Sequence, residues 1–185
     1  MPNLKRQWTV ADRDDLPDDG NRYEVIDGEL FVSPAPSMRH QRAVLQLARL
    51  LADYLDQHQT GGVYVAPADV IFSQRRGVQP DVFIVPLVNG RQPEDFDEVR
   101  RLLLAVEVLS PSTARADRVA KRTLFREESV PEYWIVDLDA RMIERSTPSE
   151  PRPELFAERI EWVPPGASEP LVIDLVAYFE RVLDR

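Results

Sequence analysis

The stretch LLLAVEVLS, residues 102–110, is the most apolar run of the chain and has the composition of a strand buried on both faces. Its sixth residue, Glu107, places a carboxylate in the middle of that run. An ionised carboxylate alone in a low-dielectric core is strongly destabilising. Four arrangements would accommodate Glu107: a charged partner, a position at the open end of the strand, a bound metal ion, or protonation.

The segments after this run predict a parallel unit of a sheet. SPST at 110–113 caps a helix expected from about residue 114 to 128, and EYWIVD at 132–137 has the pattern of a second buried strand. Two buried strands joined by a helix favour a parallel βαβ unit with a right-handed crossover. RMIERST at 141–147 is expected to return as a hairpin partner and to offer an edge for self-association.

The segments before this run predict a helix and two further strands. Ser37 is the expected N-cap of a helix from about Met38 to His58, in which apolar residues recur with helical spacing. VYVAPADVIFS at 63–73 and PDVFIVP at 80–86 have strand patterns. With the apolar run they are expected to form an antiparallel meander, which gives the core order helix, three strands, helix, strand.

The ends of the chain complete the predicted fold. RYEVIDGELFVS at 22–33 carries Asp27-Gly28 between two strand-like runs, a strong hairpin signal, and follows a short helix capped by Thr9. Residues 148–170 hold six of the sixteen prolines and are expected to be irregular. VIDLVAYFERVL is expected to close the chain as a helix.

We therefore predict an α/β fold with one mixed central sheet of core order αβββαβ, flanked by helices and preceded by an N-terminal hairpin. The length of 185 residues suits a single domain, 1–185. Within it we expect a helix and hairpin at 1–36, the core at 37–137, and a hairpin return, an irregular segment and a helix at 138–185.

Composition excludes several classes of protein. The chain has no Cys, which excludes disulfides, thiolate metal sites and Cys nucleophiles, and its two His disfavour His-rich metal sites. The net charge of −9 argues against coating of nucleic acid through broad electrostatics. We see no signal peptide and no run of transmembrane length, so we expect a cytoplasmic protein with no membrane partner.

Two acids indicate where the chemistry lies. Asp81 opens the strand 80–86, and Glu107 lies near the end of the next strand. If these strands are antiparallel neighbours, both carboxylates meet at one edge of the sheet. Two acids at one site repel unless a cation lies between them, and Mg²⁺ prefers such oxygen ligands. A strand-end cap or an Arg partner would explain either acid alone.

The helix after Glu107 carries Asp117 and Lys121, spaced i,i+4 in the favourable order for a helix salt bridge. Helical geometry turns Lys121 toward the apolar side of its helix, where a buried Lys needs a carboxylate or phosphate partner. Glu24 in the hairpin is either an outward residue or a third acid of the site. His40 lies on the inward stripe of its helix, either as a hydrogen-bonded His or as a partner for phosphate or a metal-bound water.

Taken together, RYEVIDGELFVSPAPSMRHQ, PD at 80–81, VEVLSPST, DRVAKRTLF and VPEYWIVD resemble a large bacterial family of restriction-endonuclease-like proteins in the PD-(D/E)xK nuclease superfamily. The resemblance runs from about Thr9 to the final helix. It implies a restriction-endonuclease-like fold, a Mg²⁺ or Mn²⁺ cofactor and hydrolysis of phosphodiester bonds in DNA. A homodimer or higher homo-oligomer is expected, because symmetric cleavage of two strands favours two-fold symmetry.

Carried over residue by residue, the resemblance implies that Asp81 and Glu107 bind the metal, with Glu24 as a further ligand, and that Lys121 orients or activates the attacking water. The superfamily pattern expects a Lys two residues after Glu107, where this chain has Leu109. The family it resembles supplies that Lys from the following helix.

Auxiliary roles are expected for His40 and Asp117. Ser129 stands where the family commonly ends the helix with Gly, which predicts an unfavourable left-handed cap. Two alternatives stay open: a catalytically inactive nuclease-like binding or regulatory protein, and a metal-dependent hydrolase of a smaller phosphate ester. The net charge and the absent E-x-K lysine favour the first of these.

Overall fold

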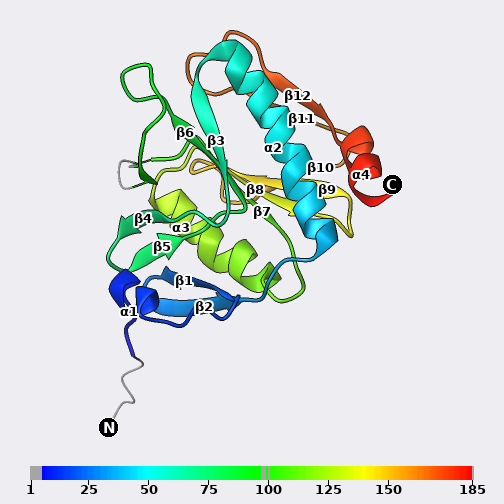
Figure 1. Ribbon diagram of the computed structural model, residues 1–185. Helices are drawn as coiled ribbons and strands as arrows, with labels where there is room; N and C mark the ends of the chain where they lie inside the picture. Colours follow the sequence, from blue (N-terminus) through cyan, green and yellow to red (C-terminus); the bar gives the residue numbers. More distant parts are fainter. Residues whose placement is uncertain (1–5, 97–98, 100, 185) are drawn as a thin grey trace.

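The computed structural model describes residues 6–96, 99 and 101–184 (Figure 1). Its elements, in chain order, are α1 (Val10–Asp14), β1 (Arg22–Ile26), β2 (Glu29–Ser33), α2 (Met38–His58), β3 (Gly61–Val65), β4 (Val70–Ser73), β5 (Arg76–Val78), β6 (Val82–Pro86), β7 (Leu104–Val108), η2 (Ala116–Lys121), α3 (Arg122–Glu127), β8 (Glu132–Asp137), β9 (Met142–Ser146), β10 (Glu154–Phe156), β11 (Arg159–Trp162), β12 (Leu171–Asp174) and α4 (Leu175–Leu183).

The central sheet has six strands in the order β10-β9-β8-β7-β6-β3. β7 and β8 are parallel, and every other neighbouring pair is antiparallel, so the predicted βαβ unit and the antiparallel meander are confirmed. All five residues of β7 are buried, as its apolar sequence predicts. β9 returns beside β8 as expected, but β10 covers its other side. The predicted edge for self-association at 141–147 is therefore wrong.

The prediction of one sheet is also wrong, because the N-terminal hairpin belongs to a second, four-stranded sheet in the order β2-β1-β5-β4. The segment 63–73, expected as one strand, divides between β3 in the central sheet and β4 in the second sheet. Pro67 lies in the connection, where its missing N–H cannot join a ladder. The second sheet crosses one end of the central sheet (Figure 1).

The proline-rich segment 148–170 is more regular than predicted. It contains β10 and β11, and β11 pairs with β12 in a two-stranded sheet. Ile160, Trp162 and Ile173 point into the core from this pair. The alternation is short, and the prolines lie between the strands rather than in them, which is why the pattern was obscured.

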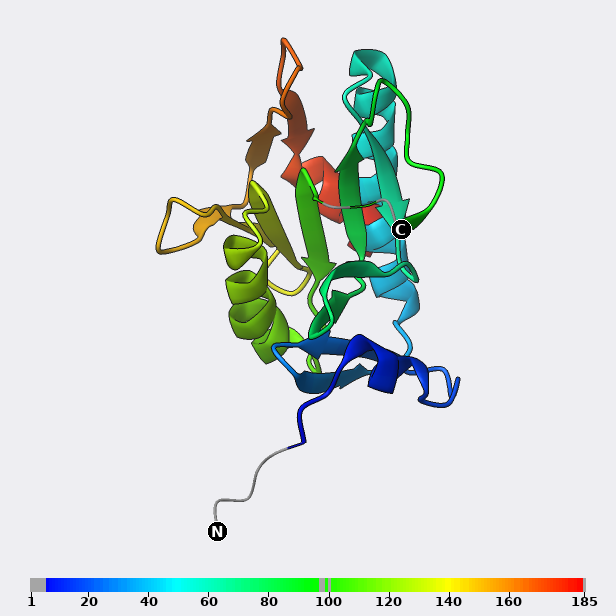
Figure 2. The same ribbon diagram turned by 90° about the vertical axis from the view of Figure 1, so that its left-hand side faces the viewer.

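Two apolar cores lie on opposite faces of the central sheet. On one face α2 and α4 pack with the β11–β12 pair, and on the other α3 packs with the second sheet (Figure 2). α2 has the predicted bounds, and Ser37 is its N-cap, whose side chain accepts a hydrogen bond from the N–H of His40. Among the described residues, no helix is long and apolar enough to cross a membrane.

The predicted helix after β7 contains a π-helical segment, η2, before α3. The composition gives no signal for it. Short π segments inside helices occur frequently at functional sites. Asp117 and Lys121 both lie in η2 and both are buried, so this segment turns two charged residues toward the sheet.

The turn after α3 has the predicted left-handed residue. Ser129 has a φ of 56°. Its N–H donates to the carbonyl of Arg126 at 3.1 Å, and the N–H of Val130 donates to the carbonyl of Phe125 at 2.9 Å. This is the Schellman pattern, in which Gly is the preferred residue at the left-handed position.

We expect Ser129→Gly to raise the free energy of unfolding by about 0.5–1 kcal/mol, because Gly has no Cβ to strain at positive φ but loses more chain entropy on folding. Urea denaturation measures the change. Ser129→Ala is the control and should stay near wild type, since Ala has the same steric conflict. An equal gain in both variants would contradict the conformational explanation.

Candidate active site

Asp81 and Glu107 lie side by side at the junction of the two sheets. Asp81 immediately precedes β6, and Glu107 is the fourth residue of β7. Val82 pairs with Val106, so the next residues outward, Asp81 and Glu107, are neighbours across the antiparallel pair. Both side chains are almost fully buried. The expected meeting of the two carboxylates at one sheet edge is thus present.

Asp81 receives three hydrogen bonds. Arg22 Nη2 donates to Oδ1 at 2.9 Å, while His40 Nε2 and the Val108 N–H donate to Oδ2 at 2.9 and 2.8 Å. Burial alone would raise the pKa of Asp81, but the bond from His40 and the charge of Arg22 outweigh it and lower the pKa to about 2. Because an ionised carboxylate only accepts, His40 carries its proton on Nε2.

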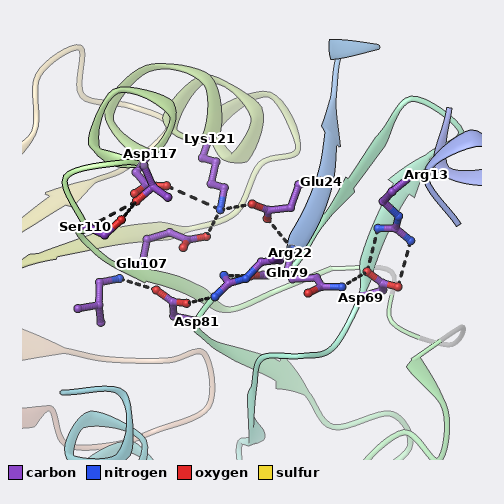
Figure 3. Close-up of polar contacts among 12 residues, drawn as sticks. Arg13, Arg22, Glu24, Asp69, Gln79, Asp81, Glu107, Ser110, Asp117 and Lys121 are labelled. Atoms are coloured by element: carbon purple, nitrogen blue, oxygen red, sulfur yellow. Dashed lines mark hydrogen bonds and ion pairs between the residues drawn. The ribbon is translucent and has the colours of Figure 1, made fainter. Parts of the chain in front are cut away.

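Lys121 is the counter-ion of Glu107, and its side chain points toward the sheet, as its position along the predicted helix indicated. Its Nζ lies 2.7 Å from Glu107 Oε1, 2.8 Å from Glu24 Oε2 and 3.7 Å from Asp117 Oδ1 (Figure 3). Burial would lower the pKa of Lys121, yet these carboxylates hold it above its ordinary value. Burial raises the pKa of Glu107 well above its ordinary value, although Lys121 opposes the change. Glu107 Oε2 has no hydrogen bond within the described part of the chain.

Asp117 is the most isolated acid of the cluster. Its side chain is buried, and burial raises its pKa, with Lys121 partly opposing the change. The i,i+4 pair expected from the sequence is therefore present but long, at 3.7 Å. Asp117 therefore adds negative charge near Lys121 but does not form a close ion pair with it.

Around Glu24, which was expected near the site, lie two residues that were not predicted there, Arg22 and Gln79. Arg22 and Glu24 lie two apart on β1, and so on one face of the strand. Gln79 joins them: its N–H donates to Glu24 Oε1 at 2.7 Å, and its carbonyl accepts from Arg22 Nη1 at 2.9 Å. The available signals were the i,i+2 spacing of Arg22 from Glu24 and the position of Gln79 just before the PD pair.

A cavity of about 560 Å³ opens onto the two acids. Its walls include residues 33–37 before α2, 107–114 after the middle of β7, and 137–139 at the end of β8. Among the described residues, every Arg and Lys that lines it is paired with a carboxylate: Arg22 with Asp81, Arg39 with Asp139, Arg118 with Asp137 and Glu144, and Lys121 with Glu24 and Glu107. The cavity therefore has little excess positive charge.

A family model named Uma2 and described as "Putative restriction endonuclease" matches residues 10–180. The chain belongs to the Uma2 family. The crystal structure of a protein described as a putative nuclease of DUF820, from Anabaena variabilis ATCC 29413, matches with a TM-score of 0.78 and 18% identity, over 95% of this chain and 99% of that chain. This likeness shows that the fold is shared. No curated protein matches significantly.

Membership of the Uma2 family implies a divalent metal ion. The acids and cations of the site show whether such an ion fits there. Four buried acids, Glu24, Asp81, Glu107 and Asp117, lie in this cluster with two cations, half-buried Arg22 and buried Lys121. This excess of buried negative charge favours either protonation or a further cation. Burial is the main cause of the raised pKa values of Glu107 and Asp117, and the neighbouring carboxylates add to it.

The described residues contain no group of three or more His, Asp or Glu arranged to hold a metal ion. Two carboxylates facing a cavity nevertheless suit Mg²⁺, which keeps several waters and often uses one or two carboxylates with substrate phosphate. Asp81 and Glu107 fit this requirement. Glu24 is engaged by Lys121 and Gln79, so its contacts are those of a residue that positions Lys121.

Proposed function

We propose that this Uma2 protein is a Mg²⁺- or Mn²⁺-dependent endonuclease that hydrolyses phosphodiester bonds in DNA, on a fold of the PD-(D/E)xK class. The observation that carries the proposal is the pair of buried acids, Asp81 and Glu107, at neighbouring strand positions beside a cavity, with Lys121 held against Glu107. Burying two acids and a Lys beside a cavity costs stability. Such clusters of buried ionisable groups are concentrated at functional sites, because the chemistry there needs them.

Asp81 and Glu107 would hold the cation. When bound, it would neutralise the negative charge that develops on the scissile phosphate. Lys121 stays protonated because Glu107 and Glu24 surround it. Its ammonium group would donate to the attacking water or to a phosphate oxygen and stabilise negative charge there. Glu24 positions Lys121, in place of the metal-binding role expected from the sequence. His40 positions Asp81 through the bond to Oδ2.

Mn²⁺ calorimetry on the wild type, Asp81→Asn and Glu107→Gln tests the metal site. We expect saturable binding by the wild type and its loss in both variants, because each removes one of the two anionic ligands. Asp139→Asn is the matched control: Asp139 also lines the cavity but pairs with Arg39, and its side chain is 86% exposed. Retention of binding by Asp81→Asn or Glu107→Gln would contradict the assignment.

Nicking of supercoiled plasmid DNA in Mn²⁺ then tests the activity. We expect nicking by the wild type and none above background by Asp81→Asn. The expected homodimer is tested separately by analytical ultracentrifugation. Binding of Mn²⁺ with no cleavage of plasmid or linear DNA would leave a metal site but contradict the endonuclease assignment.

A hydrolase of smaller phosphate esters is the second candidate. The carboxylate partners of the four described cations that line the cavity favour it, because duplex DNA is bound mainly through unpaired Lys and Arg on an open surface. Bis(p-nitrophenyl) phosphate distinguishes the two. Faster turnover of this ester than of DNA, with no dependence of KM on salt, would favour the smaller substrate.

A further inference from the structure

Both carboxylate oxygens of Asp81, a proposed metal ligand, already accept hydrogen bonds. Oδ1 accepts from Arg22, and Oδ2 accepts from His40 and from the N–H of Val108. These donors occupy three of the roughly four lone-pair positions of the carboxylate, and the remaining position on Oδ1 lies beside the positive guanidinium group of Arg22, so a cation binds there more readily if a donor withdraws. The three donors differ greatly in their freedom to do so.

The two donors on Oδ2 are fixed. The N–H of Val108 belongs to the end of β7, which is paired with β8, and His40 is a buried residue in the first turn of the 21-residue helix α2. Arg22 is different, because its side chain is long, is 18% exposed and lines the cavity. Arg22 is therefore the donor that can withdraw.

The charges around Arg22 support the same conclusion. Burial alone would lower the pKa of Arg22, but the nearby carboxylates of Asp81, Glu107 and Glu24 raise it above its ordinary value. Its guanidinium group thus lies in the field of both proposed metal ligands. A divalent cation bound there would repel the guanidinium group and compete with it for Oδ1.

We propose that Arg22 is the internal counter-ion of Asp81 in the metal-free site, and that it is exchanged for the divalent cation and then binds the substrate phosphodiester. This inference rests on the proposed function. Arg22 Nη1 also donates to the carbonyl of Gln79, so the side chain keeps an anchor when Nη2 is released. The released guanidinium group lies at the cavity wall, and its fork matches a phosphate oxygen pair.

The proposal predicts opposite effects on two ligands of Arg22→Gln. Mn²⁺ alone should bind about tenfold more tightly than to the wild type, because a charge-assisted hydrogen bond no longer competes for Oδ1. Dimethyl phosphate, the simplest phosphodiester, should bind the Mn²⁺-saturated variant at least about fivefold more weakly, because the phosphate contact is lost. Calorimetry measures both. If Arg22 only supported the fold, Arg22→Gln would weaken the binding of both Mn²⁺ and dimethyl phosphate.

Three further variants make the test specific. Arg22→Lys keeps the positive charge but removes the two parallel N–H donors of the guanidinium group. It should leave the Mn²⁺ affinity near that of the wild type and weaken the binding of dimethyl phosphate. Arg39→Gln, a cavity arginine paired with exposed Asp139, should change Mn²⁺ affinity by less than about twofold. The double variant Asp81→Asn with Arg22→Gln should bind no Mn²⁺. Circular dichroism verifies that each variant is folded.

The outcomes separate this inference from the proposed function. If the wild type binds Mn²⁺ and Arg22→Gln binds it equally or more weakly, the counter-ion role is wrong and the metal site stands. If neither the wild type nor Arg22→Gln binds Mn²⁺, both proposals are wrong, because removal of Arg22 frees Oδ1. If Arg22→Gln binds Mn²⁺ more tightly but binds dimethyl phosphate with unchanged affinity, the proposed binding of phosphate by Arg22 is wrong.

Discussion

Lys121→Met is expected to lower the free energy of unfolding by about 3–5 kcal/mol at neutral pH, the range found when one partner of a buried ion pair is removed. Lys121 is 2% exposed and is the cation in contact with both Glu107 and Glu24. Met fills a similar volume, so the loss reflects uncompensated charge rather than a cavity. Urea denaturation measures it, and cleavage should fall to background.

The pH dependence identifies the cause of this loss. Burial already raises the pKa of Glu107 and of Asp117 in the folded wild type, and removal of Lys121 raises both further. Acids with raised folded pKa values stabilise the fold below their unfolded pKa, and this stability is lost as the pH rises through the folded pKa. The deficit of Lys121→Met should therefore be smallest near pH 4.5 and grow toward neutral pH.

Arg126→Met is the matched control, because Arg126 lies on α3 one turn beyond the π segment and is exposed. It should change stability by less than about 0.5 kcal/mol at any pH. A deficit of Lys121→Met that stays constant from pH 4.5 to 7.5 would indicate lost packing instead of unpaired charge.

Much of this site was predictable from local patterns. The position of Asp81 beside Glu107 follows from two short strands in an antiparallel meander, and the inward direction of Lys121 follows from helical phase. Both depend on periodicities that hold over a few residues, and α2 has its predicted bounds for the same reason: a sustained apolar stripe that follows a Ser N-cap.

The remainder depends on contacts between segments far apart in the chain. Arg22 and Asp81 are 59 residues apart, and no local pattern indicates that β1 lies against the start of β6. β4 and β5 have four and three residues, too few for a distinctive alternation, and they become strands because β5 pairs with β1 of the hairpin and β4 pairs with β5. The partition of the N-terminal half into two sheets, and hence the role of β1 in the site, required the structure.

Glu107→Gln is expected to separate stability from function. The amide removes one of four buried negative charges while its oxygen can still accept from Lys121, which also keeps Glu24 at 2.8 Å. The free energy of unfolding should therefore stay unchanged or rise by about 1–2 kcal/mol at neutral pH, as buried ionic groups replaced by neutral ones often show. Metal-dependent cleavage should fall about 10³-fold, because a ligand of the cation is lost.

The sign of the pH effect follows from the raised pKa of Glu107. Below its unfolded pKa the wild-type residue is protonated in both states, so wild type and Glu107→Gln should be nearly equal in stability. As the pH rises through the folded pKa, the wild type loses stability and the variant does not, so the advantage of Gln grows. Denaturation at a series of pH values measures this difference. If Glu107→Gln were less stable than the wild type at neutral pH, the contact of Glu107 with Lys121 would outweigh its burial, and the apolar strand would hold its carboxylate for structure rather than for a cation.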